Sequence, residues 1–378
     1  MQIDDKSRET TDTPKRAEMF SSTGLGVPPM PPTTANIKDL GPASDSPTHL
    51  STQAQLDLQA EGISDEKPVS PLRASLRRFS RDRRAMISLT IVALIFVASI
   101  IGPFIYLHIG PTIKGGFSSN ISEGPEIYHN YIHQELVRSD QPPSLAYPLG
   151  TDRLGRDILA RLLAGVNVSV QVAFLVLVFD IGLGLIVGTL AGYYGGWIDT
   201  FLARFTDLIF AFPALLFAIV AAATLGSEFT DRLGPSGRLI LVSLALGITI
   251  WPQMARYVRG QTLQLKEQQF IEASRTVGTS DSGIIMRHIV PNLFSIVLTA
   301  ATLDIVGIII GEATISLLGL GVQPPGSSLG LMISDGAPMI SIAFHETLFP
   351  VLTLAIIVLC LSFVGDGIGD AFNPRRKD

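Results

Sequence analysis

The feature that most constrains this chain is a series of six apolar runs that are long enough, or nearly long enough, to cross a bilayer. A helix rises 1.5 Å per residue, so about 20 apolar residues span a hydrocarbon core of about 30 Å. The fourth and sixth runs are short, which leaves their ends uncertain by a few residues. The runs predict an all-α, polytopic membrane protein with six transmembrane helices. They cover residues 85–107, 166–194, 208–227, 239–254, 293–322 and 348–364.

The composition supports a membrane protein over a pair of soluble domains. Charged residues make up 16% of the 378 residues, against about 25% in soluble domains. The single cysteine, Cys360, lies inside the last apolar run, so the chain has neither an intrachain disulfide framework nor a cysteine metal cluster. We therefore expect no metal site and no cofactor bound by this chain.

Residues 1–84 precede the first run and are rich in Ser, Thr and Pro, with Phe20 and Phe79 as their only aromatic residues. Such a segment buries too little apolar surface to offset its ordering entropy, so we expect a disordered arm. Six arginines crowd its end, and we interpret them as a topology signal rather than a nucleic-acid patch. They are Arg73, Arg77, Arg78, Arg81, Arg83 and Arg84.

Positive charge predicts the orientation of the spans. With the N-terminus inside, the inner segments hold fifteen Lys or Arg residues and the outer segments hold seven. Since cytoplasmic loops carry the excess of positive charge, both termini and the loop 253–292 are predicted to be cytoplasmic. The tail 367–378 is then cytoplasmic, and 110–165 is external. Residues 166–366 form a core of five further spans.

The external segment ends in a pattern that predicts an amphipathic helix over residues 151–164, with Thr151 as its N-cap. One face is apolar and the other carries Arg153, Arg156, Asp157 and Arg161, which is typical of a helix lying in the membrane interface. The candidate site residues of this segment are Asp152, Arg156 and Asp157. We interpret it as an elbow that steers the chain into the second span, with contact to an external partner as the alternative. A second external segment, 321–347, contains apolar pieces too short to span, and it predicts a re-entrant or lid-like element.

Two acidic residues lie inside predicted spans. Asp180 is in the second run and Asp304 in the fifth, where a centrally placed acid costs about 2.5–3.5 kcal/mol to insert. They either line an aqueous translocation path or hydrogen-bond to neighbouring helices. Glu312, further along the fifth run, is expected near the outer interface and is a third candidate for the path.

The longest polar stretch between spans, 253–292, predicts a docking element at the membrane face. Motifs that would make the chain an enzyme are missing. No GxxxxGK[ST] loop is present to cradle nucleotide phosphates. His345 and Glu346 begin a zinc-protease pattern, but Phe349 stands where its second His belongs. We therefore predict no catalytic residues.

Several stretches together resemble the integral-membrane permease subunits of binding-protein-dependent ABC importers. The loop is similar to their Glu-Ala-Ala–x3–Gly signature, with Ser274 in place of the second Ala. The positions that match it are Glu272, Ala273, Gly278, Ile289 and Pro291. Further motifs resemble the second (C-type) permease of oligopeptide, dipeptide or nickel importers. They are PLGTD at 148–152, GRD at 155–157, AGYYGG at 191–196, GLGVQPP at 319–325 and GDG at 365–367.

The resemblance implies a type I ABC importer permease fold in a bacterial or archaeal cell membrane. It implies that residues 272–278 belong to a cytoplasmic coupling helix that docks on an ATPase, with Arg287 and His288 where the chain re-enters the membrane. The implied partners are a second permease subunit, two ABC ATPase subunits and an extracytoplasmic substrate-binding protein. The implied cargo is a peptide or a similar small solute.

Two other functions compete with this interpretation. A self-sufficient secondary transporter or channel would use Asp180 and Asp304 as ion sites, and it would act without partner subunits. An intramembrane aspartyl protease would use Asp370 of the Gly-Ile-Gly-Asp stretch at 367–370. That chemistry needs a second carboxylate at the same depth, and no predicted span supplies one opposite Asp370.

Overall fold

A computed structural model describes residues 71–109 and 129–372, and its ordered elements over these ranges are helices. Three parts of the chain fall outside the described residues. They are residues 1–70, for which disorder is predicted, the first part of the external segment (110–128) and the end of the tail (373–378). In chain order the long helices are α3 (Arg83–Ile109), α4 (Ile158–Tyr194), α5 (Gly196–Phe210), α6 (Ala214–Leu233), α7 (Gly237–Lys266), α10 (Val290–Leu317) and α12 (Phe344–Phe372). The short elements are α2 (Pro71–Phe79), η1 (Leu136–Arg138), η2 (Gly234–Ser236), α8 (Gln269–Thr276), α9 (Asp281–Ile284), η3 (Ile285–Ile289), α11 (Leu329–Gly336) and η4 (Ala337–Met339).

Six helices in the described ranges are long and apolar enough to cross a membrane, which confirms the predicted six-span, all-α architecture. Their ends differ from the hydropathy limits. The fourth and sixth spans are longer than predicted, because α7 continues to Lys266 and α12 to Phe372. The predicted loop 253–292 therefore begins as the last turns of α7, and the predicted tail from 367 begins as helix.

The third predicted span, 208–227, is present with shifted ends, since the helix long enough to cross covers Ala214–Leu233. α5 ends at Phe210, and α6 begins only at Ala214 after Pro213. Proline has no N–H to donate, so it cannot continue the ladder of α5 but is tolerated where α6 starts. Hydropathy misses this break because the residues at 211–213 are themselves apolar.

The end of the N-terminal arm is ordered, which corrects the expectation of disorder up to Arg84. α2 is a helix, and Asp82 caps α3 by accepting the backbone N–H of Arg84 at 2.9 Å. Phe79 packs on α12, where it would lie 3.3 Å from a Cβ placed at Gly367. Contact with α12 supplies the apolar burial that the isolated segment lacks.

α4 and α7 form the most extensive helix–helix contact. The glycines of the second span allow the two backbones to approach each other closely. A Cβ added at Gly188 would lie 2.5 Å from the Ala255 carbonyl oxygen, and one at Gly184 would lie 2.5 Å from Met254 Cγ. Gly192 meets α7 one turn further on. Small residues at four-residue spacing thus form the surface on which the two helices pack.

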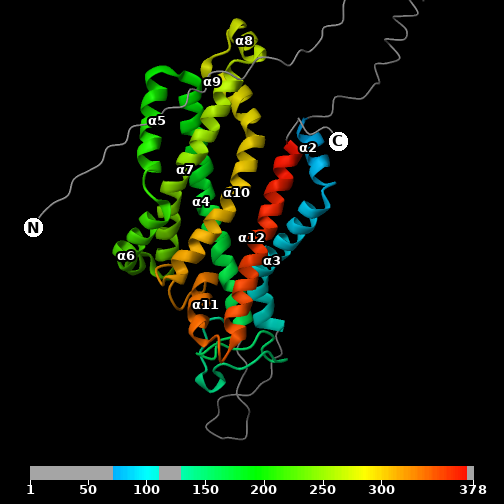
Figure 1. The fold of residues 1–378 in the computed structure, drawn as a ribbon, viewed down its shortest axis with the longest axis vertical. Helices are drawn as coiled ribbons and strands as arrows, with labels where there is room; N and C mark the ends of the chain where they lie inside the picture. Colours follow the sequence, from blue (N-terminus) through cyan, green and yellow to red (C-terminus); the bar gives the residue numbers. More distant parts are fainter. Residues whose placement is uncertain (1–70, 110–128, 373–378) are drawn as a thin grey trace, which may run out of the picture. The chain divides into compact units, whose positions relative to one another are not determined.

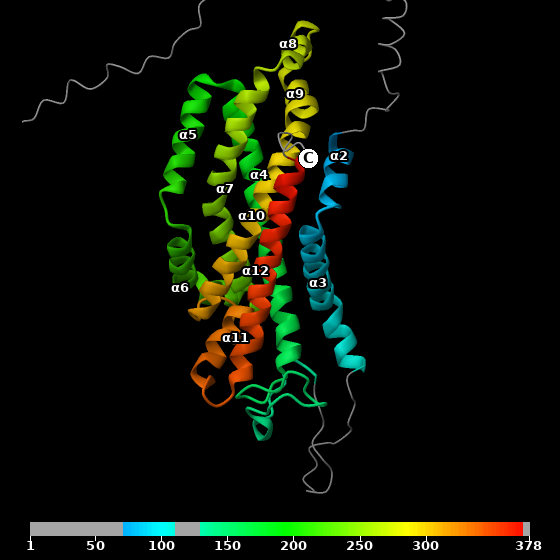
Figure 2. The same cartoon turned by 45° about the vertical axis from the view of Figure 1, so that its right-hand side comes forward.

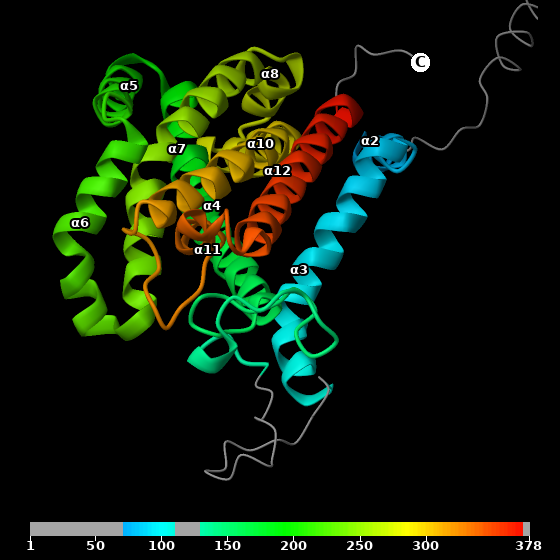
Figure 3. The same cartoon turned by 60° about the horizontal axis from the view of Figure 1, so that its bottom comes forward.

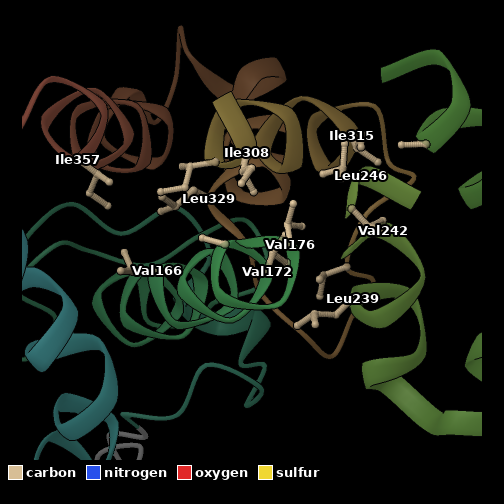
Figure 4. Packing of buried hydrophobic residues seen from close by; sticks show 14 of the residues in the cluster. Val166, Val172, Val176, Leu239, Val242, Leu246, Ile308, Ile315, Leu329 and Ile357 are labelled. Atoms are coloured by element: carbon tan, nitrogen blue, oxygen red, sulfur yellow. The ribbon is translucent and has the colours of Figure 1, made fainter. Parts of the chain in front are cut away.

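One apolar core joins these helices (Figure 4). The same cluster contains Val176 of α4, Leu246 of α7, Ile308 of α10, Leu329 of α11 and Ile357 of α12. α11 is thus the folded part of the predicted lid, and its buried face packs on α10 and α12. The core fixes the helices that carry the functional side chains.

Different elements of the chain form the two ends of the bundle. α8 and α9 lie at one end, and α11 with residues 129–157 lies at the opposite end (Figures 1 and 2). α3 packs against α4 and α12, on the side away from α5 and α6 (Figure 3). We call the first end the loop end and the second the outer cap (residues 129–157 with α11 and the first turn of α12).

A minimal test of the α4–α7 packing is the pair Gly188→Ala and Gly182→Ala. Alanine favours a helix over glycine by about 1 kcal/mol, so Gly182→Ala, whose Cβ meets nothing within 4 Å, should be neutral or slightly stabilising. Gly188→Ala forces α7 away and should lower stability by about 1–3 kcal/mol. Thermal unfolding of the two purified variants measures the difference. Equal stability would contradict the packing assignment.

Candidate functional site

The loop end is built from the end of α7, the helix α8, and a return segment formed by α9, η3 and the start of α10. The chain reverses at Gly278, whose φ of +87° favours glycine and whose added Cβ would meet nothing within 4 Å. Residues 281–283 form the first turn of α9. Ser280 caps that turn by accepting the Gly283 N–H at 3.4 Å.

α8 is seated on the bundle through one apolar face. Ile271 is completely buried and clusters with Ile284 and Ile289 of the return segment and with Val258 of α7. The other face of the loop is open, since Glu272 and Ala273 are exposed and Val277 is 85% exposed. The loop is therefore a fixed platform with an outward-facing surface.

Polar contacts tie both arms of this loop to the end of α4. The Tyr193 hydroxyl donates to Asp281 Oδ1 at 2.6 Å, and the Arg275 guanidinium lies 5.4 Å from the centre of the same ring. Arg275 thus packs on Tyr193, and among the described residues Glu272 forms no ion pair. A displacement of the loop would therefore act directly on α4 through these contacts with Tyr193.

The return segment contains Arg287 and His288 in the π-turn η3, directly before α10. His288 is half-buried, with Nε2 3.5 Å from Ser274 Oγ and its ring 6.3 Å from that of Phe270. Arg287 and Pro291 are exposed. Pro291 has no N–H for the carbonyl four residues earlier, which helps explain why the helix widens here.

Arginines near the end of α7 are neutralised by α5. Arg259 donates from Nε and Nη2 to the two Asp199 oxygens at 2.5 and 2.8 Å, and Arg256 reaches Asp207 at 2.8 Å. The hydrogen bonds from Arg259 hold the pKa of Asp199 below its usual range. α5 is thereby fixed to the same end of the bundle.

In the membrane core, the structure brings Asp180 and Asp304 together from α4 and α10. The two carboxyl groups are close enough to interact electrostatically. Asp180 is fully buried, and neither of its oxygens has a hydrogen-bond donor among the described residues. Two neighbouring carboxylates repel unless a proton or cation lies between them.

A cavity of about 550 Å³ adjoins this pair toward the loop end. Asp304 is half-buried and lines it, together with Gln253, Tyr257, Ser295 and Thr299. The cavity thus has polar groups from α7 and α10 in otherwise apolar surroundings. Asp304 therefore lines the cavity, whereas Asp180 is buried and does not line it.

Glu312 lies elsewhere, in a closed polar cluster. It is 2% exposed, and it accepts the hydroxyls of Ser169 at 3.0 Å and Ser316 at 2.7 Å. Ser169 is on α4, so the cluster joins α4 to α10. The structure gives Glu312 a visible role in helix association, and its predicted place on the path stays a prediction.

The predicted elbow helix over 151–164 is wrong. α4 begins at Ile158 with Asp157 as its N-cap, accepting the Leu159 N–H at 2.8 Å, and then runs without interruption to Tyr194. Asp152 and Arg156 are buried in the preceding irregular segment. The periodicity misled because these charges pair with one another, so they are not facing water. Arg156 Nε lies 2.8 Å from Asp152 Oδ2.

The fold is a multi-span helical bundle with a loop platform at one end, and the comparisons with known proteins give its family. The family model "Binding-protein-dependent transport system inner membrane component" matches residues 184–378. The model "N-terminal TM domain of oligopeptide transport permease C" matches residues 70–113.

Relatives agree with these matches. The chain is 35% identical over 318 residues to the oligopeptide transport system permease protein OppC of Bacillus subtilis (strain 168), covering 84% of this chain and 94% of that protein. It is 35% identical over 305 residues to the glutathione transport system permease protein GsiD of Shigella dysenteriae serotype 1 (strain Sd197), covering 80% and 89%. A solved inward-facing MetNI methionine ABC transporter matches with a TM-score of 0.45 and 21% identity, over 57% of this chain and 98% of that chain.

The chain belongs to the family of binding-protein-dependent transport system inner membrane components. It is a permease subunit of an ABC importer and a multi-pass protein of the inner membrane.

Sequence reasoning missed the residues that hold the platform in place. Ile271 and Ile284 are isolated apolar residues in a polar stretch, and that contrast is a usable signal. Tyr193 and Asp281 are 88 positions apart, so no local pattern links them. The proximity of Asp180 and Asp304 was also not predicted, although both were singled out.

A test of the anchoring is Tyr193→Phe, with Tyr194→Phe as the matched control. The first variant loses a hydrogen bond to a carboxylate that contributes about 1–2 kcal/mol, whereas Tyr194 is 46% exposed. We expect faster hydrogen exchange over residues 269–289 in Tyr193→Phe only, measured by mass spectrometry on the purified chain. Unchanged exchange would show that Ile271 alone holds the loop.

Proposed function

We propose that this chain forms half of the translocation pathway of an ATP-driven importer for oligopeptides, dipeptides or similar small peptides. Its partners in this proposal are a second permease subunit, two ABC ATPase subunits and an extracytoplasmic substrate-binding protein. The observation that carries the proposal is the exposed face of α8 on a buried apolar seat. Its family membership and its two relatives named for oligopeptide and glutathione transport support the substrate class.

The proposal places the loop end in the cytoplasm, in keeping with the excess of Lys and Arg in the predicted inner segments. Glu272, Ala273 and Val277 would then meet an ATPase groove. Closure of the ATPases would push α8, and the contact of Tyr193 with Asp281 would pass the push to α4. In this proposal the chain binds no cofactor and catalyses no reaction, since ATP is bound and hydrolysed by the partner subunits.

We propose further that the cavity beside Asp304 belongs to the inward-open part of the path. A membrane protein retains an acid in its core where it faces protein or an aqueous space. Asp304 and the hydroxyls of Ser295 and Thr299 would then keep the cavity hydrated as the peptide leaves. Asp180 would support Asp304 from behind.

Docking is tested by Glu272→Arg and Gly278→Leu. Charge reversal on the exposed face, or a side chain forced on the positive φ of Gly278, should release the ATPases while the membrane domain stays folded. We expect loss of ATPase co-purification and of ATP-driven uptake. Glu228→Arg, an exposed acid on the last turns of α6, is the control and should retain both. Survival of both activities in the loop variants would refute docking at α8.

The path is tested by Asp304→Asn with Asp366→Asn as control. Loss of about 1.4 kcal/mol of stabilisation at the limiting step lowers the rate about tenfold, and we expect a decrease of this order in peptide uptake by the reconstituted importer. ATPase co-purification should not change. Asp366, exposed on α12, should have no effect. Normal uptake in Asp304→Asn would remove this residue from the path.

The alternative, a self-sufficient secondary transporter or channel, is favoured by one observation, the proximity of Asp180 and Asp304. It requires gradient-driven flux in liposomes that contain this chain alone. The importer requires no flux without ATPases and the second permease. The same liposomes, with and without the co-purifying subunits, distinguish the two.

A further inference from the structure

Five arginines form a dense positive surface where the chain enters its first span. They lie on the last turn of α2, in the turn that follows it and on the first turn of α3, and all five are exposed. They are Arg77, Arg78, Arg81, Arg83 and Arg84. We call these five residues the arginine collar.

The collar is held at a fixed place on the bundle. Phe79, within the collar segment, packs on α12, and Ala85 is completely buried where it meets Gly367 of α12. α2 and the start of α3 therefore lie beside the last turns of α12, at the loop end (Figures 1 and 2). A topology signal requires only positive charge near a span, so it does not account for arginines that an ordered, packed helix holds in place.

The carboxylates of the described residues do not neutralise the collar. Asp82 is the one acid within residues 77–84, and its side chain caps α3 by accepting the N–H groups of Arg84 and Ala85 at 2.9 and 3.3 Å. In the part of the chain that the structure describes, no ion pair joins a collar arginine to any carboxylate, Asp366 and Asp370 of α12 included. Five arginines and one aspartate leave this segment with a net charge of +4.

The stability of α3 gives no reason for part of this charge. The N-terminus of a helix carries partial positive charge and favours acids, yet Arg83 and Arg84 occupy the first two positions of α3. Arg77 and Arg78 are at the C-terminal end of α2, where cations are favoured. Arg83 and Arg84 therefore raise the repulsion within the collar, and an anion from outside the chain would relieve it.

The collar adjoins the face of α3 that is turned away from the bundle. Ile87, Leu94 and Ile101 are exposed and follow one another at seven-residue spacing, so they share one face of the helix. Arg84 precedes Ile87 by three residues and lies at the end of the same face. Such an apolar face contacts lipid tails, and the headgroups begin where it ends. Leu76, which is 55% exposed beside the collar, also suits this boundary.

We propose that the arginine collar binds the phosphate groups of anionic phospholipid headgroups at the loop end of the first span. A guanidinium group is weakly hydrated and donates two parallel hydrogen bonds to a phosphate. Each basic residue beside an anionic membrane surface strengthens binding roughly fivefold. The bound headgroups would fix the depth of α3 in the membrane. This inference goes beyond the proposed transport function and depends neither on the solute nor on ATPase docking.

The experiment measures hydrogen exchange by mass spectrometry over residues 71–84 of the full chain in lipid nanodiscs. One nanodisc contains phosphatidylcholine alone, and the other contains about 30% phosphatidylglycerol, an anionic lipid. At about 50 mM NaCl we expect about tenfold slower exchange in the anionic nanodisc, and most of this difference should disappear at about 500 mM NaCl because salt screens the charges.

A pair of double variants tests whether the collar is responsible. Arg81→Gln with Arg84→Gln should remove most of the difference between the two lipids, while the other three collar arginines keep the orientation signal. Arg153→Gln with Arg232→Gln removes the same charge from exposed arginines of the outer cap and of α6, and it should keep the difference.

Four results would overturn the proposal. The first is equal exchange of the wild-type chain in the two lipids, and the second is a difference that survives in Arg81→Gln with Arg84→Gln. The third is equal slowing by inorganic phosphate in phosphatidylcholine nanodiscs, which would identify a free anion as the ligand. The fourth is slowing that requires the ATPase subunits and not the anionic lipid, which would identify a protein partner. The comparison of lipids in the wild-type chain decides the matter even if the collar variant does not fold.

Discussion

The close packing of α4 on α7 is the constraint on which the rest of the structure depends. Gly184, Gly188 and Gly192 let the two backbones approach until no Cβ fits between them. Such contact fixes both the rotation and the depth of α4, because a glycine stripe matches its partner in one register only. The side chains on the other faces of α4 are therefore held at defined heights, and these are the residues that carry its polar contacts.

Polar contacts along α4 occur at intervals, and each joins it to a different part of the chain. Asp157 at its N-cap contacts His129, and Arg161 binds Asp335 of α11. Ser169 binds Glu312 of α10, and Tyr193 binds Asp281 at the loop end. In apolar surroundings a hydrogen bond specifies its partner because an unpaired group is costly. The glycine stripe thus supplies proximity, while the polar residues decide what α4 is connected to. Asp180 differs in having only another acid beside it.

Hydrophobic length predicted the number of spans, and the long polar stretch between two of them predicted the position of the loop, because both signals are local. The failures were of two physical kinds. Apolar residues on both sides of Pro213 made two helices look like one span. Charges at helical spacing over 151–164 predicted a surface helix, whereas Arg156 and Arg161 are buried by pairing with Asp335, which is more than 170 positions away. The platform was predicted by resemblance, but its seat on Ile271 and Tyr193 depends on contacts that no local pattern contains.

The uninterrupted length of α4 has a mechanical consequence. Its 37 residues form a strut of roughly 55 Å at 1.5 Å per residue, with Asp157 at one tip and Tyr193 near the other. A displacement of Tyr193 along the axis reaches Asp157 without passing through a joint. α5 and α6 are separated by Pro213 and can flex there. The same force would thus displace α4 along its axis as one rigid helix, whereas it would change the angle between α5 and α6.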